Sequence, residues 1–205
     1  MSIKKSENIL KKDIIGTELE EKIKLERARD TLLMIGIFSV IMLFAGLTSA
    51  YIVSKGSLGE QWDYIILPNF FYVSTLMILI SSLFAHFSIN FCKSNNFKML
   101  TRFLLLTMLF GFLFFLFQIL GWKSVINDGK FLAGNNVASS YLYVLTLTHF
   151  SHVLGGVIAL VVIFIFALNK KYNSNNLHGL KLGIRFWHFL TILWIYLFLF
   201  LMLIN

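Results

Sequence analysis

Long apolar stretches alternate with short polar segments along this chain. Five stretches carry few or no charged residues, and a helix of about 20 apolar residues crosses a hydrocarbon core of roughly 30 Å. The pattern therefore predicts an all-α, polytopic membrane protein, a bundle of five transmembrane helices. The expected spans are about 31–54, 68–91, 103–121, 138–168 and 182–204.

Composition supports the membrane assignment. Of the 205 residues, 58% are hydrophobic and 14% are charged, a balance too apolar for a soluble domain. Residues 1–30 are polar and are expected to form a cytoplasmic tail before the membrane domain of residues 31–205. In the tail, Glu18/Lys22 and Glu20/Lys24 have the acid four residues before the base, which favours a surface helix. A solvated charged linker fits the tail as well.

The distribution of lysine and arginine predicts the orientation. Loops rich in these residues stay on the cytoplasmic side. Residues 1–30, the second loop and the fourth loop hold fifteen of the 18, and the first and third loops hold the other three. We therefore expect the N-terminus in the cytoplasm and the C-terminus outside. This asymmetry accounts for the net charge of +8 without nucleic-acid binding.

Carboxylates are confined to the tail and the outer loops. A proton pump or cation transporter needs an intramembrane acid to carry or balance charge, so the pattern disfavours both for this chain alone. A single cysteine, Cys92, excludes an internal disulfide. The candidate functional side chains in the spans are His86, His149, His152, His188, Gln118, Trp187 and Trp194.

The histidines allow two interpretations. His152 and His188 are expected at similar depths on the fourth and fifth spans, and bis-histidine haem ligation uses such a pair. Against this, His149 and His152 share a helix face with Gly156, where a neighbouring helix can approach closely and accept or donate a hydrogen bond. Two histidines without a carboxylate or cysteine make a poor metal site. We favour packing and hydrogen-bonding histidines at a helix interface.

Four segments resemble one known family and occur in its order. They are STLMILISS (74–82), LFGFLFFLFQ (109–118), YLYVLTLTHFSHVLGGVIAL (141–160) and RFWHFLTILWIYLFLF (185–200). The chain is similar over about residues 30–205 to subunit III of the haem–copper oxidases (cytochrome c oxidase), in the five-helix bacterial form.

This resemblance implies a non-catalytic subunit without a catalytic or cofactor-binding residue or a metal site of its own. Haem and copper would belong to partner subunits, the main contact would be oxidase subunit I, and subunit II and other respiratory-complex subunits would lie nearby. The complex would reduce O₂ in the aerobic respiratory chain of a bacterial inner membrane, and phospholipid would be bound between helices. Helix-interface or lipid contacts are expected at His149, His152, Gly155, Gly156, Trp187, His188, Trp194, Gln118 and Gly111.

The chain departs from the family at positions where relatives hold acids. Val40, Gly121 and Thr191 stand at three such positions, and Phe150 replaces a glycine between the two histidines. These departures imply that this chain takes no part in proton uptake. Three other functions stay open: an accessory subunit of a nitric oxide reductase, a haem b electron carrier that uses His152 and His188, and a small transporter or channel. The electron donor, cytochrome c or quinol, is not encoded here.

Overall fold

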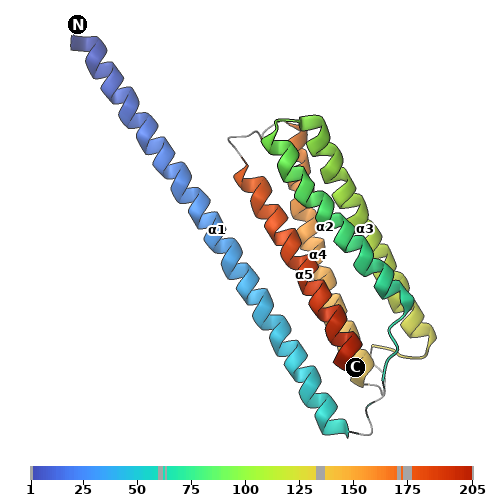
Figure 1. Ribbon diagram of the computed structural model, residues 1–205. Helices are drawn as coiled ribbons and strands as arrows, with labels where there is room; N and C mark the ends of the chain where they lie inside the picture. Colours follow the sequence, from blue (N-terminus) through green and yellow to red (C-terminus); the bar gives the residue numbers. More distant parts are fainter. Residues whose placement is uncertain are drawn as a thin grey trace. The chain divides into compact units, whose positions relative to one another are not determined.

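The computed structural model describes residues 2–59, 62, 64–132, 137–169, 172 and 177–204. Over these residues the chain forms five α-helices and no strand: α1 (Ser2–Leu58), α2 (Asn69–Lys93), α3 (Phe97–Asn127), α4 (Val137–Leu168) and α5 (His178–Ile204) (Figure 1). Each helix contains a stretch long and apolar enough to cross a membrane. The predicted fold class, an all-α polytopic membrane protein, is confirmed.

Most helix ends lie beyond the spans expected from the sequence. α3 starts at Phe97, six residues before the expected span, because the side chain of Asn96 accepts a hydrogen bond from the backbone N–H of Met99 and so caps the helix. The start of α2 lies inside its expected span. Pro68 was expected inside the span but lies just before the helix, with an extended ψ of 148°.

The chain divides into two compact units, residues 1–39 and residues 40–205. In the first unit, α1 is helical from Ser2 and has no break at residue 30. That residues 1–30 form a cytoplasmic tail stays a prediction.

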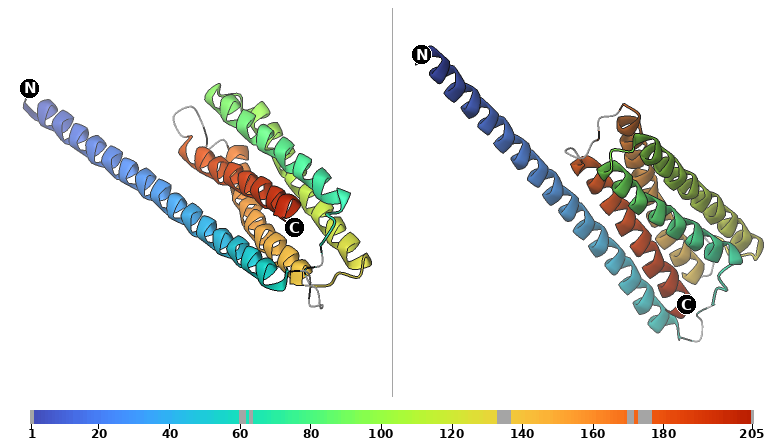
Figure 2. Two further views of the ribbon diagram at one scale, coloured as in Figure 1. Left: turned by 60° about the horizontal axis from the view of Figure 1, so that its bottom comes forward. Right: turned by 45° about the horizontal axis from the view of Figure 1, so that its top comes forward.

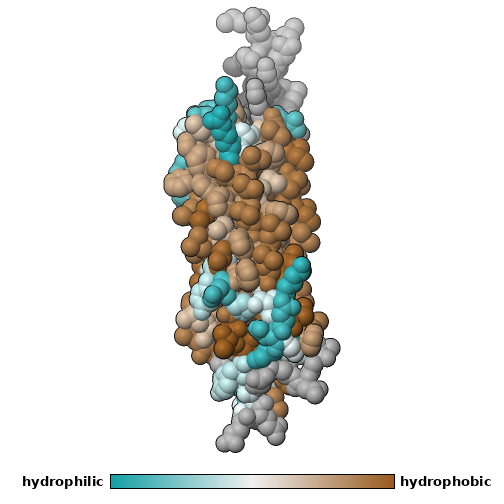
Figure 3. Space-filling view, turned by 90° about the vertical axis from the view of Figure 1, so that its right-hand side faces the viewer, coloured by the Kyte–Doolittle hydropathy of each residue, from teal (hydrophilic) through white to brown (hydrophobic). Residues whose placement is uncertain are grey.

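In the second unit, α2, α3, α4 and α5 lie side by side (Figures 1 and 2). α2 packs against α3 and α5, and α4 packs against the same two helices. The buried centre is rich in large aromatic side chains, among them Phe71, Phe114, Trp187 and Trp194. One face of the molecule is hydrophobic along its middle and hydrophilic towards both ends (Figure 3), as expected of a surface that meets lipid.

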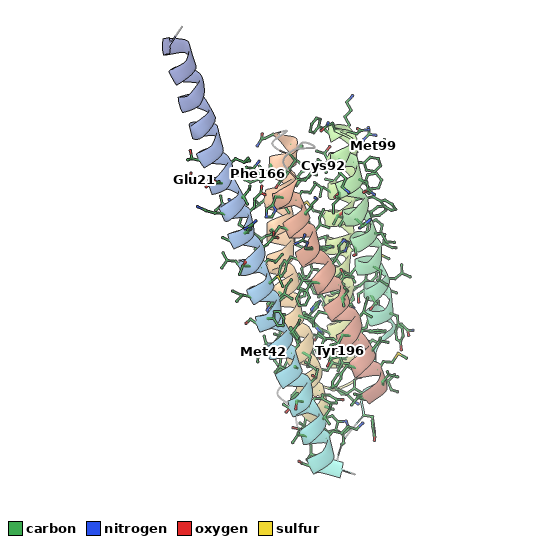
Figure 4. The ribbon with its side chains drawn as sticks, turned by 60° about the vertical axis from the view of Figure 1, so that its left-hand side comes forward. Glu21, Met42, Cys92, Met99, Phe166 and Tyr196 are labelled. Atoms are coloured by element: carbon green, nitrogen blue, oxygen red, sulfur yellow. The ribbon has the colours of Figure 1, made fainter. Side chains whose placement is uncertain are left out.

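Both ends of the bundle can be located by labelled side chains in Figure 4. Cys92 near the end of α2, Met99 near the start of α3 and Phe166 near the end of α4 lie at one end. Tyr196 of α5 lies nearer the other end. At that other end, the ammonium group of Lys55 donates a hydrogen bond to the backbone carbonyl of Ile204.

Candidate functional site

Trp187 of α5 lies against glycines of two other helices. A Cβ atom built on Gly111 of α3 would lie 3.1 Å from the indole ring, and one built on Gly156 of α4 would lie 3.2 Å from it and 2.7 Å from Leu190. Gly155 is different, because a Cβ atom there would meet no described atom within 4 Å. The structure thus brings together Gly111, Gly156 and Trp187, and it leaves Gly155 on the exposed face of α4.

The two tryptophans of α5 donate hydrogen bonds to hydroxyl groups of α2. Nε1 of Trp187 lies 3.2 Å from Oγ of Ser81, whose hydroxyl donates in turn to the backbone carbonyl of Thr107 on α3 at 2.7 Å. Nε1 of Trp194 lies 2.9 Å from Oγ1 of Thr75. Because lipid offers no hydrogen-bond partner, these contacts satisfy indole groups that would otherwise be buried without one.

Two further hydroxyls of α2 complete a row that we call the hydroxyl seam, formed by Ser74, Thr75, Ser81 and Ser82. Nε2 of Gln118 donates to Oγ of Ser74 at 2.8 Å. Nδ1 of His188 lies 2.6 Å from Oγ of Ser82. The seam repeats after seven residues, a spacing that keeps its members on one side of a helix. Segment 74–82 was expected to resemble the family, but its hydroxyls were not expected at a helix contact, although the seven-residue repeat of adjacent hydroxyl residues is readable in the sequence.

His149 is fully buried, and among the described residues neither of its ring nitrogens has a hydrogen-bond partner. Its ring lies 5.2 Å from the Trp194 ring and just over 6 Å from the rings of Phe44 and Phe114, measured between centroids. His152 is half-buried, and its Nδ1 lies 2.7 Å from the carbonyl of Thr148 in its own helix. Of these histidines, only His188 makes a side-chain hydrogen bond to another helix among the described residues.

The arrangement does not suit a bis-histidine haem. The ring of His152 packs on Phe44 at 5.8 Å, whereas the ring of His188 packs near His86 at 5.9 Å. Within the described part of the chain, no group of three or more His, Cys, Asp or Glu side chains could hold a metal ion. The two histidines therefore belong to different helix contacts.

Packing and hydrogen bonds occupy three of the positions at which this chain departs from the family. A Cβ atom at Gly121 would lie 2.8 Å from the ring of Phe71, so a longer side chain has no room there. Thr191 is buried and donates its hydroxyl to the carbonyl of Trp187. Phe150, in place of a glycine, packs on Phe115 at 4.5 Å between centroids.

The family model for cytochrome c oxidase subunit III matches residues 20–204 of this chain. The chain belongs to this family. It is 27% identical to a cytochrome c oxidase subunit 3 of Corynebacterium diphtheriae, over 78% of this chain and 80% of the relative. It is 30% identical to a cytochrome bo(3) ubiquinol oxidase subunit 3 of Buchnera aphidicola, over 80% of this chain and 85% of the relative. A cytochrome c oxidase subunit 3 of Bacillus sp. is 25% identical, over 77% of this chain and 76% of the relative.

The segments that carried the family resemblance are also the segments that meet at the helix interfaces. Residues 74–82 hold the hydroxyl seam, and residues 109–118 hold Gly111 and Gln118, which contact α5 and α2. Residues 141–160 and 185–200 supply Gly156 and the two tryptophans of α5. In this chain, Gly111, Gln118, Gly156, Trp187 and Trp194 of the family motif make contacts between helices, whereas Gly155 does not.

Proposed function

We propose that this chain is the non-catalytic, cofactor-free subunit III of a terminal haem–copper oxidase. The observation that carries the proposal is that Gly111, Gly156, Gln118 and Trp187 are engaged in packing or hydrogen bonds between helices. The histidines, which are the side chains that could ligate haem iron or copper, lie in separate helix contacts, because His152 packs on Phe44 and His188 bonds to Ser82. Family membership and the oxidase subunits among the relatives support the same function.

The reduction of O₂ takes place in the other subunits of the oxidase complex. Haem and copper lie in partner subunits, where electrons reduce O₂ to water, and this chain packs against subunit I in the company of subunit II. Its relatives include both cytochrome c and ubiquinol oxidases, so the proposal names the subunit rather than the electron donor. The chain lies in the bacterial inner membrane, spans it several times and holds phospholipid between helices. It takes no part in proton uptake.

Purification of the complex through a tag on this chain tests the proposal. Subunit I should be recovered with the tagged chain, and its haem and copper content should be unchanged when this chain is removed, as measured by the pyridine haemochrome assay and metal analysis. Turnover should decline faster in the depleted complex. Loss of one haem per complex, or a haem absorption band in the isolated chain, would contradict the proposal.

A further inference from the structure

A groove of about 310 Å³ lies between the last two turns of α2 and the first three turns of α5. Its polar lining is His86, Asn90 and Lys93 from α2, and Lys181, Arg185 and His188 from α5. Lys93 and Lys181 are exposed, so their ammonium groups are available to a ligand. None of the polar lining residues is acidic. The groove therefore has the character of an anion site.

His188 is held in a fixed orientation at the inner end of this groove. Nδ1 lies 2.6 Å from Oγ of Ser82, and its ring packs near that of His86. The other nitrogen, Nε2, is a buried atom with no hydrogen-bond partner among the described residues. A buried polar group left in this state is unfavourable. In the tautomer in which Ser82 donates to Nδ1, Nε2 carries the hydrogen and an incoming oxygen acceptor would improve its environment.

One exposed face of α2 continues from the groove towards the middle of the bundle. Leu76, Leu79 and Leu83 lie on it with exposed fractions of 53%, 41% and 60%. His86, Asn90 and Lys93 follow at the same alternating spacing of three and four residues, which keeps all six on one side of the helix. At 1.5 Å per residue, the apolar and the polar parts each extend roughly 10 Å. The face thus changes from hydrocarbon-like to cationic in the way that a lipid changes from acyl chain to headgroup.

The surrounding sequence does not neutralise the lysines. Between Tyr64 and Ile204 the single carboxylate is Asp128, which caps the far end of α3. With the orientation predicted from the charge distribution, the groove faces the cytoplasmic leaflet, where anionic lipids attract basic side chains.

We infer that this groove binds the phosphate-bearing headgroup of an anionic phospholipid, with an acyl chain along Leu76, Leu79 and Leu83. The inference rests on the proposed function, because it assigns a place and a headgroup class to the lipid that a subunit III would hold. Free phosphate shares the headgroup chemistry. The apolar face that leads directly into the groove favours the lipid.

Native mass spectrometry of the full chain in detergent tests the inference. Cardiolipin, phosphatidylglycerol, phosphatidylcholine and inorganic phosphate are added separately to the unaltered chain, to a Lys93→Gln/Lys181→Gln variant and to a Lys98→Gln/Arg102→Gln control. The control removes the same charge at the same end of the bundle but outside the groove. We expect anionic lipid to be retained at least about fivefold less by the groove variant than by the control, and phosphatidylcholine to be retained equally by all three. Circular dichroism establishes that both variants are folded.

Three results would overturn the inference. The first is an equal loss of anionic lipid in the groove variant and the control. The second is retention of inorganic phosphate with no preference among lipids, which would make the groove a phosphate site. The third is a cross-link from a photoreactive residue at position 83 to another protein chain in native membranes, which would make the face a subunit contact. Failure to recover subunit I with the chain would contradict the proposed function. It would not change the result of the lipid measurement, which is made on the chain alone.

Discussion

The indole of Trp187 occupies space that two other helices leave open by having glycine at positions 111 and 156. Small residues let helices approach closely in a membrane, where dispersion forces and hydrogen bonds replace the hydrophobic effect as the source of association. Gly155 precedes Gly156 in the sequence but faces outward. A packed and an unpacked glycine can therefore be compared at these two adjacent positions.

Gly156→Ala should lower the stability of the chain, whereas Gly155→Ala should leave it unchanged or raise it. The added methyl group at 156 would meet Leu190 and Trp187, and overpacking of this kind costs about 1–3 kcal/mol. At 155 only the helix propensity changes, by up to about 1 kcal/mol in favour of alanine. Thermal unfolding in detergent measures both. A lower midpoint for Gly155→Ala than for Gly156→Ala would show that the packing around Trp187 is not as described.

His149 and His188 differ in whether they make a hydrogen bond. We expect His149→Leu to be neutral or stabilising, because it removes a buried group without a partner, which costs about 1–3 kcal/mol. His188→Leu should destabilise the chain, since it breaks the bond to Ser82. Both variants should leave the haem content of the complex unchanged. The comparison uses the thermal midpoint of each variant, and a larger drop for His149→Leu than for His188→Leu would contradict the difference in hydrogen bonding between the two side chains.

Part of the candidate site could be predicted at this scale. The glycine face of the fourth span and the tryptophans of the fifth were identified from their spacing and from the family motif. The spacing placed Gly156 on the face of His149, whereas Gly155 was also expected at an interface and instead faces outward, because which face of a helix is covered depends on where its neighbours lie. The partners Ser74, Thr75, Ser81 and Ser82 were missed, since a serine in an apolar helix can equally bond its own backbone.

α2 is the helix that receives hydrogen bonds from two others. Its hydroxyl seam accepts from Gln118 of α3 and from Trp187 and Trp194 of α5. A further buried serine, Ser88, donates only to the carbonyl of Ala85 in its own helix among the described residues. Serines of α2 therefore bond either to another helix, as Ser81 does, or to the backbone of α2 itself, as Ser88 does.

Ser81→Ala should destabilise the chain more than Ser88→Ala. The first change leaves the indole N–H of Trp187 buried without its partner, at a cost of about 1–3 kcal/mol, and removes the bond that the Thr107 carbonyl accepts from Ser81. The second removes a bond within one turn of α2. Ser81→Gly should be no more stable than Ser81→Ala, because glycine restores neither hydrogen bond. Tryptophan fluorescence during chemical unfolding ranks the stabilities of the variants. Equal unfolding midpoints for Ser81→Ala and Ser88→Ala would contradict a stabilising role of the hydroxyl seam.

Lys55 connects α1 with the end of α5. Its ammonium group donates to the carbonyl of Ile204 and lies 5.0 Å from the ring centroid of Tyr64. A cation at a helix C-terminus stabilises it by about 0.3–1 kcal/mol. Lys55→Met should therefore lower the thermal midpoint, while Lys123→Met at an exposed position of α3 should not. Faster hydrogen exchange at the last turn of α5 in Lys55→Met would support the contact, and unchanged exchange there would contradict it.

The existence of the helices was predictable, but their ends were not. Hydrophobic stretches predict the part of a helix that lies in hydrocarbon, whereas backbone hydrogen bonds and caps decide where the helix stops. Asn96 and Gly129 set the limits of α3 in this way. Gly129 has a positive φ of +77° just beyond the helix. The unbroken course of α1 was also beyond prediction, because polar residues suit a surface helix and an extended linker equally.

The whole molecule is predicted to have one orientation, with fifteen lysines and arginines on the cytoplasmic side and three on the other. A reporter that is active only in the cytoplasm should be inactive after Ile204 and active when fused before Ser2. A reporter active only outside the membrane should give the opposite result. Activity of the cytoplasmic reporter after Ile204 would mean an even number of spans or an inverted bundle.

The contacts between α2 and α5 have a consequence for biosynthesis. The hydroxyls of α2 leave the ribosome early, but the tryptophans that bond to them belong to the last helix. At about 5–20 residues per second, the interval between the two helices is roughly 5–20 s. During this time the half-made protein presents to lipid the surface that α5 will cover. Docking of α5 is then the last step of folding. A chain that ends before His178 lacks α5, and we expect membrane proteases to degrade it readily.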